Sequence, residues 1–471
     1  MKEKYHIVIL LLLLVLSAGL RLYQLGDVSL WFDETLTASK TLIPFNRIID
    51  TMAETGEENP PGYFFLINIW SRLFGKSGFS LRFPSLIFSL LGVFTIYYLG
   101  KNLFSPKVGL MAALLLSISP YNINYAQEAR MYSLVWSLGL GSFYFFYRWI
   151  RDGSTRALVF AILVNLLAFC ISYSQVLIII TQNIIFLIIF NRKLVKRWLV
   201  SQIILLALIS PLIFLLLEQS ANRSVGGWIY LSDNFRVLFR GTLSYMSGDL
   251  SGRGSLAVWG TYLILIAIGG FSFADHRLRL KPTREDYFLW LWGIIPITIG
   301  LGINLFFYPF LSPLTIRYIG FIQFPFFLAA SRGISRLRPG IGLAMLLLLA
   351  GVTVSKYLIP YYRDDIRIGK EDWRGLIAHL EETADDTSLL VLTPGTFLPY
   401  RYYGTGKISS IQFQAKDGEP AIGPGHEKVT VIYRNWKQRN RLKVLVGYSS
   451  VEHFSSGNIG FYRFESSPVI E

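Results

Sequence analysis

The sequence contains little cysteine, little histidine and little charge. Its one cysteine, Cys170, excludes a disulfide framework and a cysteine-based zinc site, and its apolar surroundings favour a buried hydrophobic role. The five histidines show no metal-ligand spacing. Only 16% of the residues are charged, whereas an ordinary soluble domain has about 25%. Because apolar runs recur up to about residue 360, a soluble enzyme with one N-terminal anchor is excluded.

The excess positive charge lies in one part of the chain. The sequence has 45 Lys and Arg against 30 Asp and Glu, and residues 361–471 hold 14 of each kind. The whole excess of 15 therefore belongs to residues 1–360. In a membrane protein such an excess marks cytoplasmic loops, and no basic and aromatic groove is apparent outside the apolar runs. We expect membrane lipids as partners and no nucleic acid.

The apolar runs predict a polytopic α-helical membrane protein. Residues 1–24 have a basic start and an apolar core, which are compatible with a cleaved signal peptide. The later apolar runs favour an uncleaved first transmembrane helix. Ten further spans are expected at 81–100, 107–122, 130–148, 156–173, 175–191, 198–217, 255–273, 286–308, 314–331 and 340–359. The segment PPGYFFLINIWSRLF is short and interrupted by Arg72, which favours an interfacial or re-entrant helix. If it and one other segment cross, eleven spans become thirteen.

Alternate loops between these spans are basic. The basic residues are Lys101 and Lys107; Arg148, Arg151 and Arg156; Arg192, Lys193, Lys196 and Arg197; Arg277, Arg279, Lys281 and Arg284; and Arg332, Arg336 and Arg338. This alternation predicts a plasma or inner membrane protein with a cytoplasmic N-terminus. The loops 21–80 and 218–254 and the tail are then extracytoplasmic. The long loop 218–254 is either a mobile lid or a solvated connector.

The tail, residues 361–471, predicts a small extracytoplasmic domain of the α/β or α+β class. GKEDWRGLIAHLEE is amphipathic with a helical period, whereas SLLVLTP, KVTVIYRNW, RLKVLVGYSS and NIGFYRFES are typical of strands. We therefore divide the chain into a transmembrane catalytic domain, residues 1–360, and a tail domain, residues 361–471. A Gly-rich phosphate loop and an HExxH motif are absent, which disfavours a P-loop transport ATPase.

Three motifs at the expected outer edge of the membrane carry charged residues. Charges at this depth are costly unless paired or used, so each is a candidate site. The motifs are SLWFDETLTA with Asp33 and Glu34, EENPPGYFF with Glu57 and Glu58, and SPYNINYAQEARMYSL with Glu128, Arg130 and Tyr132. Each also has an ordinary structural interpretation: solvated carboxylates, charges at a helix start, or an ion pair to another loop.

Taken together, the motifs resemble a known family. The order is DE after the first span, E-x-P-x-G-Y, R-x-P-S, Y-x-x-E-x-R-M-Y and, later, IRYIGFIQFPFF. This order resembles the polytopic glycosyltransferases of the C superfamily (GT-C). Within it, the sequence is similar to glycosyltransferase family 39, dolichyl-phosphate-mannose-protein mannosyltransferase-like enzymes and lipid A aminoarabinose transferases. The resemblance covers roughly residues 1–335, and EDWRGLIAHL…FLPYRYYG looks like the tail of many bacterial members.

The resemblance implies roles for the acidic residues. Asp33 matches the loop aspartate proposed as the base that deprotonates the acceptor, and Glu34 is its paired neighbour. Glu58 matches the acidic residue of the family's E-K-P-x-G-Y motif, although Asn59 replaces the lysine expected to touch the donor phosphate. Glu128 matches the acidic residue of the second outer loop. A divalent metal ion at Asp33, Glu58 or Glu128 is one option, and the cofactor stays unknown.

Arginine and tyrosine residues complete the implied donor site. Arg130 and Arg317 are the candidates that stabilise the leaving phosphate. Arg317 and Tyr318 match an Arg-Tyr pair at the start of a late span, for which interfacial anchoring is the alternative. Tyr132 is a candidate donor contact or a residue of the aromatic belt.

The sequence therefore predicts a membrane glycosyltransferase. It would take a sugar from a polyprenyl phosphate and transfer it, with inversion, to an envelope lipid, a glycan or a protein hydroxyl at the extracytoplasmic face. A transporter or flippase of lipid-linked sugars is the alternative, but it should show paired halves or broken helices near the midplane, which the sequence lacks. A receptor or scaffold built around the tail would not need the loop carboxylates.

Overall fold

The computed structural model contains two compact units. It describes residues 2–55, 57, 59–189, 192–222, 256–270, 272–274, 277–279, 282–306, 316–363, 370–383, 388–393, 395–406, 408, 410–412, 428–434, 448–456 and 459–466. The helical unit comprises Met1–Tyr23, Phe45–Leu66 and Arg82–Ile366. The sheet unit comprises Gln24–Pro44, Ile67–Leu81 and Arg367–Glu471. The sheet unit thus groups part of the first loop with the tail, whereas the division at residue 360 stays a prediction.

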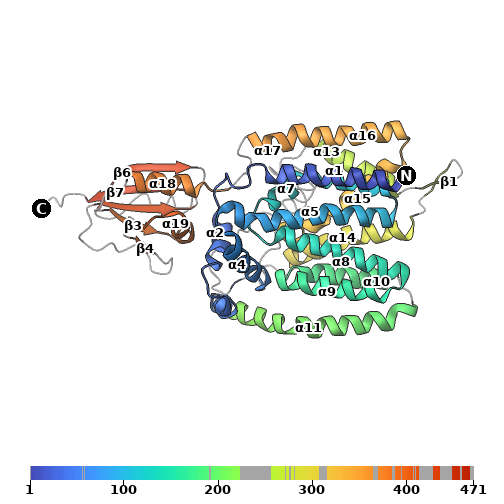
Figure 1. Cartoon of the computed structure of the whole chain (residues 1–471), viewed down its shortest axis with the longest axis horizontal. Coiled ribbons are helices and arrows are strands. Elements are labelled where there is room, and N and C mark those ends of the chain that lie inside the picture. Colours follow the sequence, from blue (N-terminus) through green and yellow to red (C-terminus); the bar gives the residue numbers. More distant parts are fainter. Residues whose placement is uncertain are drawn as a thin grey trace. The chain divides into compact units, whose positions relative to one another are not determined.

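Helices of very different lengths build the helical unit, and the long ones run alongside one another (Figure 1). They are α1 (Lys2–Leu22), α5 (Gly78–Leu103), α6 (Pro106–Ser117), α7 (Pro120–Ala126), α8 (Tyr132–Asp152), α9 (Thr155–Ile171), α10 (Gln175–Ile188), α11 (Val195–Asn222), α13 (Leu256–Gly270), α14 (Arg284–Phe306), α15 (Gln323–Arg336), α16 (Pro339–Val352) and α17 (Ile359–Arg363). Further described elements are α3 (Ile48–Thr55), β1 (Ser272–Ala274), β2 (Arg277–Arg279) and α4 (Gly62–Phe74), of which residues 62–66 belong to this unit.

Each of the eleven expected spans overlaps a helix. Among the described residues, four helices are long and apolar enough to cross a membrane: Glu3–Leu22, Gly78–Leu103, Arg192–Ala221 and Pro339–Arg363. The aromatic segment of the first loop forms α4, which has only 13 residues. The long loop 218–254 is described only up to residue 222, so its interpretation as a lid lies outside the described residues.

Two expected spans differ in their ends. The span expected at 107–122 is divided, because Pro120 has no N–H to continue α6 and Ser119 caps α7, its Oγ accepting from the Asn122 N–H at 3.4 Å. The span expected at 314–331 begins as a helix only at Gln323. Residues 316–322 form 3₁₀ turns, and Gly320 lies so close to the Trp136 ring that a Cβ would meet it at 2.1 Å. The backbone at Gly320 therefore packs directly against the indole ring of Trp136, and a larger residue would not fit.

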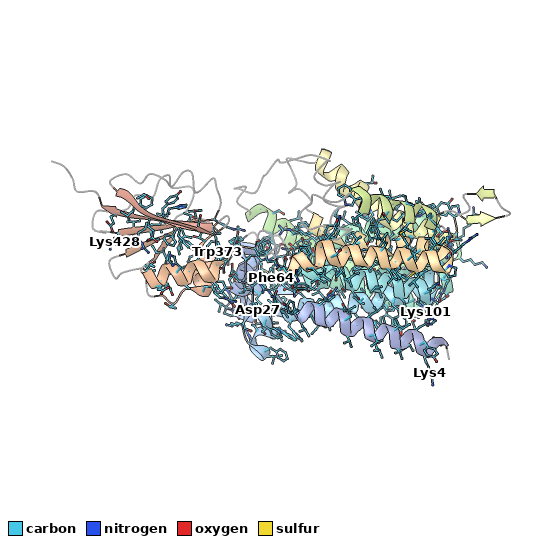
Figure 2. All side chains as sticks on the ribbon, turned by 90° about the horizontal axis from the view of Figure 1, so that it is seen from above. Lys4, Asp27, Phe64, Lys101, Trp373 and Lys428 are labelled. Atoms are coloured by element: carbon cyan, nitrogen blue, oxygen red, sulfur yellow. The ribbon has the colours of Figure 1, made fainter. Side chains whose placement is uncertain are left out.

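The loops predicted to be basic meet at one end of the helical unit. Figure 2 places Lys4 and Lys101 at the same end, and the Lys101 ammonium lies 2.8 Å from the Glu3 carboxylate. Arg197 donates to the carbonyl of Gly153 at 3.4 Å, and Arg284 donates to that of Ile189 at 3.0 Å. Residues far apart in sequence thus join the loops at this end.

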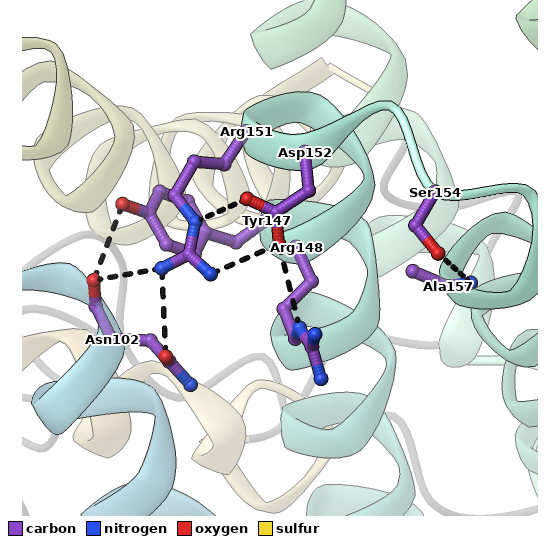
Figure 3. A network of polar contacts seen from close by, with 7 residues as sticks. All are labelled: Asn102, Tyr147, Arg148, Arg151, Asp152, Ser154 and Ala157. Atoms are coloured by element: carbon purple, nitrogen blue, oxygen red, sulfur yellow. Dashed lines mark hydrogen bonds and ion pairs between the residues drawn. The ribbon is translucent and has the colours of Figure 1, made fainter.

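A polar network joins two of these loops (Figure 3). Arg151 donates to both oxygens of the Asp152 carboxylate at 2.7 and 3.0 Å and to the carbonyl of Asn102 at 3.4 Å. Arg148 lies 3.7 Å from Asp152. Ser154 caps α9 by accepting from the Ala157 N–H at 3.4 Å. The ends of α5 and α8 are therefore fixed against each other.

The sheet unit contains a mixed sheet with strand order β4-β3-β5-β7-β6. Its strands are β3 (Ser388–Leu392), β4 (Ser410–Gln412), β5 (Lys428–Tyr433), β6 (Tyr448–Ser456) and β7 (Ile459–Ser466). β3 is parallel to β4 and β5, whereas β7 is antiparallel to β5 and β6. The expected strands at 388–394, 428–436 and 458–466 match β3, β5 and β7, and of the strand expected at 441–450 only 448–450 is described.

One face of this sheet is covered by the amphipathic helix. α18 (Trp373–Thr383) buries Trp373, Leu376, Ile377 and Leu380 in a cluster with strand residues of β3, β5 and β7. The helix α19 (Phe397–Tyr403), which the sequence analysis did not predict, contributes Tyr400 to the same cluster. Helix α2 (Phe32–Lys40), from the first loop, contacts α19. The described tail is therefore a small α+β fold with part of the first loop attached.

Candidate active site

The turn between α7 and α8 carries one group of candidate residues. Glu128 is 3% exposed, Arg130 is 5% exposed and Tyr132 is 1% exposed. The side-chain amide of Gln127 donates to the carbonyls of Arg21 and Tyr23 at 3.0 and 2.8 Å, and its oxygen accepts from the Tyr361 hydroxyl at 2.8 Å. These bonds hold the turn against the C-terminal end of α1.

Glu128 is held by a residue of the helix that precedes it, α7. The Nδ2 of Asn124, one helical turn earlier, donates to Glu128 Oε1 at 3.1 Å. Next in the turn, the carbonyl of Arg130 accepts from the Ser85 hydroxyl of α5 at 3.0 Å. A carboxylate and a guanidinium are therefore both buried within three residues, at a place where unpaired charge is expensive.

Two arginines from distant parts of the chain approach the same tyrosine. The guanidinium carbon of Arg130 lies 5.9 Å from the centre of the Tyr132 ring, and that of Arg317 lies 5.7 Å from it. The Tyr318 ring lies 6.2 Å from that of Tyr132. These distances fall within the range of cation–π contacts. Of the six residues expected to bind the donor or its phosphate, four thus lie together: Arg130, Tyr132, Arg317 and Tyr318.

The backbone of Arg317 is held by a residue of α8. Trp136 Nε1 donates to the Arg317 carbonyl at 3.2 Å, and the Trp136 ring stacks on Tyr121 with ring centres 5.4 Å apart. Burial raises the pKa of the nearby Tyr125 well above its usual value; the charges of Tyr121 and Glu128 add to this rise and that of Arg317 opposes it. Since the ordinary pKa of tyrosine is already about 10, the Tyr125 side chain is a neutral phenol at pH 7 and a hydrogen-bond donor.

Sequence reasoning missed a buried arginine that supports this turn. Arg21, fully buried in α1, donates to Asn122 Oδ1 at 2.7 Å, to the Ser117 carbonyl at 3.0 Å and to the Ser89 hydroxyl at 2.7 Å. It also donates to the Ser17 hydroxyl at 2.6 Å. The signal was weak, because Arg21 lies in the last turn of α1, where an arginine commonly extends to the membrane surface.

The sheet unit carries the other candidate acid. Asp33 lies in the first turn of α2 and is partly exposed, whereas Glu34 is fully buried. Glu34 Oε2 accepts from the Trp31 backbone N–H at 3.4 Å, which is the return bond of a helix N-terminus. The two adjacent carboxylates are thus in different environments: Glu34 fixes the start of the helix and Asp33 is accessible to solvent.

The second motif is described only in part, and Glu58 lies outside the described residues. Its neighbour Asn59 is 4% exposed; its Nδ2 donates to Glu57 Oε1 at 3.4 Å and its carbonyl accepts from Gln219 at 3.2 Å. Within the described parts of the chain, no group of three or more His, Cys, Asp or Glu side chains is arranged to hold a metal ion. The set Asp33, Glu58 and Glu128 stays a prediction.

Comparison with known sequences gives a family match over part of the chain. Residues 58–215 match the family described as dolichyl-phosphate-mannose-protein mannosyltransferase. A Bacillus subtilis (strain 168) protein, YycA, whose name describes it as a candidate mannosyltransferase, is 25% identical over 223 residues. That match covers 45% of this chain and 32% of the relative, so the chain spans about a third of the relative's length.

Comparison with solved structures extends over nearly the whole chain. ArnT from Cupriavidus metallidurans bound to undecaprenyl phosphate has a TM-score of 0.62 at 10% identity, covering 96% of this chain and 97% of its own. The Archaeoglobus fulgidus oligosaccharyltransferase in complex with Zn and sulfate has a TM-score of 0.54 at 13% identity, covering 96% and 72%. The arabinofuranosyltransferase AftD from Mycobacteria has a TM-score of 0.54 at 13% identity, covering 99% and 42%.

These likenesses confirm the predicted fold class, a polytopic helical membrane protein with a small C-terminal domain. The chain is therefore a membrane protein with the fold of the GT-C glycosyltransferases, and the resemblance predicted from its motifs is confirmed over residues 58–215.

Proposed function

We propose that the protein is a membrane glycosyltransferase that takes a sugar from a polyprenyl-phosphate donor. The observation that supports this most directly is the approach of Arg130 and Arg317 to Tyr132. Two guanidinium groups beside a buried aromatic cluster suit a phosphate that carries a sugar and an apolar chain. The family match over residues 58–215 and the undecaprenyl phosphate bound to the ArnT neighbour support the same donor class.

The proposed reaction is a single displacement at the anomeric carbon. The acceptor hydroxyl loses its proton to the Asp33 carboxylate as its oxygen forms a bond to that carbon. The bond between the anomeric carbon and the phosphate oxygen breaks on the opposite side, and the electron pair leaves with the polyprenyl phosphate. Arg130 and Arg317 stabilise the charge of this leaving group. Because one carboxylate acts and no covalent intermediate forms, the configuration inverts.

The remaining candidates have supporting roles in this proposal. Glu34 holds the first turn of α2 and so supports Asp33. Glu58 and Glu128 position the donor or a divalent ion, and Tyr132 and Tyr318 form the aromatic wall on which the arginines pack. The acceptor is a hydroxyl of an envelope lipid, a glycan or a protein.

We also propose the sidedness that the basic loops predict. Tyr132 begins α8 and Asp152 ends it, and 21 helical residues correspond to about 30 Å, the thickness of the hydrocarbon core. The candidate cluster therefore lies at the membrane edge opposite the basic loops. With those loops cytoplasmic, the reaction takes place at the extracytoplasmic face of the plasma or inner membrane.

Transfer from defined donors tests the proposal. Purified protein in lipid nanodiscs is mixed with membrane extract and a panel of radiolabelled polyprenyl-phosphate sugars, including mannose, aminoarabinose and arabinofuranose. Asp33→Asn is measured in parallel, with Asp27→Asn as a matched control because Asp27 is an exposed carboxylate of the same loop. We expect wild type and Asp27→Asn to transfer one sugar, and Asp33→Asn to lose activity by about 10²- to 10⁴-fold.

The two parts of the proposal fail separately. Protein that is folded, as judged by its thermal transition, and that transfers no sugar from any donor contradicts the glycosyltransferase. Movement of labelled lipid across the bilayer by the same protein would then favour a flippase. Equal transfer by wild type and Asp33→Asn keeps the enzyme and removes Asp33 as its base.

A further inference from the structure

One carboxylate of the tail is bonded to the start of the helix that carries Asp33. Glu371 Oε2 accepts from the Phe32 backbone N–H at 3.1 Å and from Trp373 Nε1 at 2.8 Å. Glu371 Oε1 accepts from Arg434 Nε at 2.6 Å. The Glu371 side chain is only 9% exposed and that of Arg434 only 10% exposed. Phe32 directly precedes Asp33 and is 339 residues from Glu371, so this contact is not imposed by the local chain.

Arg434 makes a second contact with the same residue. Its guanidinium carbon lies 4.0 Å from the centre of the Phe32 ring. Gly395 lies behind both, where a Cβ would meet Arg434 Cδ at 3.2 Å and Phe32 Cε2 at 3.9 Å, and its φ of +90° suits glycine. Glu371 thus bonds the Phe32 backbone while its ion-pair partner covers the Phe32 ring.

The loop before Phe32 is held by further residues of the tail. The Arg374 backbone N–H donates to Ser29 Oγ at 3.0 Å, and the Arg374 guanidinium donates to the Asp27 carbonyl at 3.3 Å. The hydroxyl of Tyr403, in α19, accepts from the Leu30 backbone N–H at 2.6 Å. Figure 2 labels Asp27 and Trp373 on the two segments that meet here.

We propose that Glu371 is a positioning residue for Asp33, acting through Phe32 and Arg434, and that the tail domain is for this reason part of the catalytic apparatus. The inference rests on the proposed function of Asp33. Helix α2 has nine residues, which is too short to be stable without tertiary support. The carboxylate of Glu371 satisfies a backbone N–H at its start, and a negative charge is favourable there. Without this contact the first turn of α2 loses its fixed position.

Hydrogen exchange and transfer kinetics together test this role. Glu371→Ala is compared with wild type and with Glu465→Gln, a half-exposed tail carboxylate 3.9 Å from Lys428. We expect Glu371→Ala to speed amide exchange in residues 26–34 and to lower kcat about 10²-fold, while KM for the donor stays within a factor of two to three. Glu465→Gln should behave as wild type. Glu371→Gln, which keeps acceptor capacity for the Phe32 N–H, should recover part of kcat and is the second variant if Glu371→Ala does not fold.

The readouts separate this inference from the proposed function. Faster exchange at 26–34 with unchanged kcat overturns the positioning role, and so does a lower kcat with unchanged exchange. A Glu371→Ala effect on donor KM alone also overturns it. If wild type transfers no sugar, the proposed function fails first, and exchange at 26–34 still reports whether Glu371 holds the segment.

Discussion

Glu128 and Asp33 are both acidic residues of motifs expected at the outer membrane edge, but the protein holds them in different ways. Glu128 is 3% exposed and belongs to the turn between α7 and α8, which is fixed by neighbouring helices of the helical unit. Asp33 is partly exposed and lies in a nine-residue helix whose start is bonded to the tail. One acid is placed by helix packing, the other by a small number of side-chain contacts.

This difference separates the two halves of the proposed reaction. The arginines that would hold the phosphate are part of the transmembrane fold, so the donor chemistry is tied to the arrangement of the spans. The base that would activate the acceptor depends on residues near positions 371 and 434. Changes in the tail should therefore affect acceptor activation more than donor binding, and changes in α7 and α8 should do the reverse.

The largest effect on transfer is expected when Arg130 or Arg317 is removed. Arg317→Ala and Arg130→Ala should each lower kcat/KM about 10²- to 10³-fold, because each removes a donor to the charge that develops on the leaving phosphate. Arg317→Lys keeps the charge without the planar fork and should be intermediate. The measurement is steady-state transfer from whichever donor of the panel the wild type uses.

Arg148→Ala, at the other end of α8, is the control for the arginine variants and should transfer sugar normally. Amide exchange at residues 26–34 should stay at the wild-type rate in all of them. Normal transfer by Arg317→Ala would contradict phosphate binding and favour interfacial anchoring as the role of Arg317.

A smaller loss is expected when the buried acid is neutralised. Glu128→Gln keeps the shape and the acceptor for Asn124 but removes the charge, and should lower transfer about 10²-fold. If Glu128 holds a divalent ion, wild type should also lose activity with a chelator and regain it with added Mg²⁺ or Mn²⁺, whereas Glu128→Gln should not respond. Transfer by Glu128→Gln at the wild-type rate would remove Glu128 from the site.

The sequence predicted the helices and the clustered residues because their signals are local or ordered. Apolar runs locate the spans, and each of the eleven overlaps a helix. The family resemblance put Arg130 and Arg317, 187 positions apart in the chain, in one expected donor site, and both guanidinium groups lie near the Tyr132 ring. Helix packing then brings residues at the same membrane edge together.

The contacts that hold Asp33 were not predictable in the same way. Glu371 and Arg434 are ordinary charged residues of a polar tail, and nothing in their local sequence points to Phe32. The short elements α19 and β4 were missed because seven- and three-residue segments carry too few positions to show a period. Arg21 was missed as well, since an arginine in the last turn of an apolar helix does not by itself indicate buried partners.

Arg21 allows the helical unit to be weakened by itself. Arg21→Leu removes the guanidinium that donates to the side chains of Asn122 and Ser89 and to three backbone carbonyls. It should lower the free energy of unfolding by about 2 kcal/mol. Thermal unfolding in detergent measures this loss. Arg21→Lys should recover part of it.

Because Asn122 belongs to α7, the Arg21→Leu substitution should also raise exchange in the turn that carries Glu128, while exchange at residues 26–34 stays unchanged. The reverse pattern, faster exchange at 26–34 only, would break the separation between the two regions.

The smallest expected effect lies at the end of α8 far from the candidate cluster. There, Asp152 accepts a hydrogen bond from Arg151, which is the main reason why the pKa of Asp152 is below its ordinary value of about 3.9. Burial opposes this shift. A lowered pKa in the folded state means that the ion pair stabilises the protein above about pH 4 and that this contribution is lost as the pH falls further. Since the pair is at the surface, Asp152→Asn should cost only about 0.5 kcal/mol at pH 7, and progressively less as the pH falls below about 4. Thermal unfolding of wild type and Asp152→Asn between pH 7 and pH 3 tests the sign of this pH dependence. Normal sugar transfer by Asp152→Asn would separate this end of α8 from the chemistry. A loss of transfer would show that the two ends of α8 are coupled.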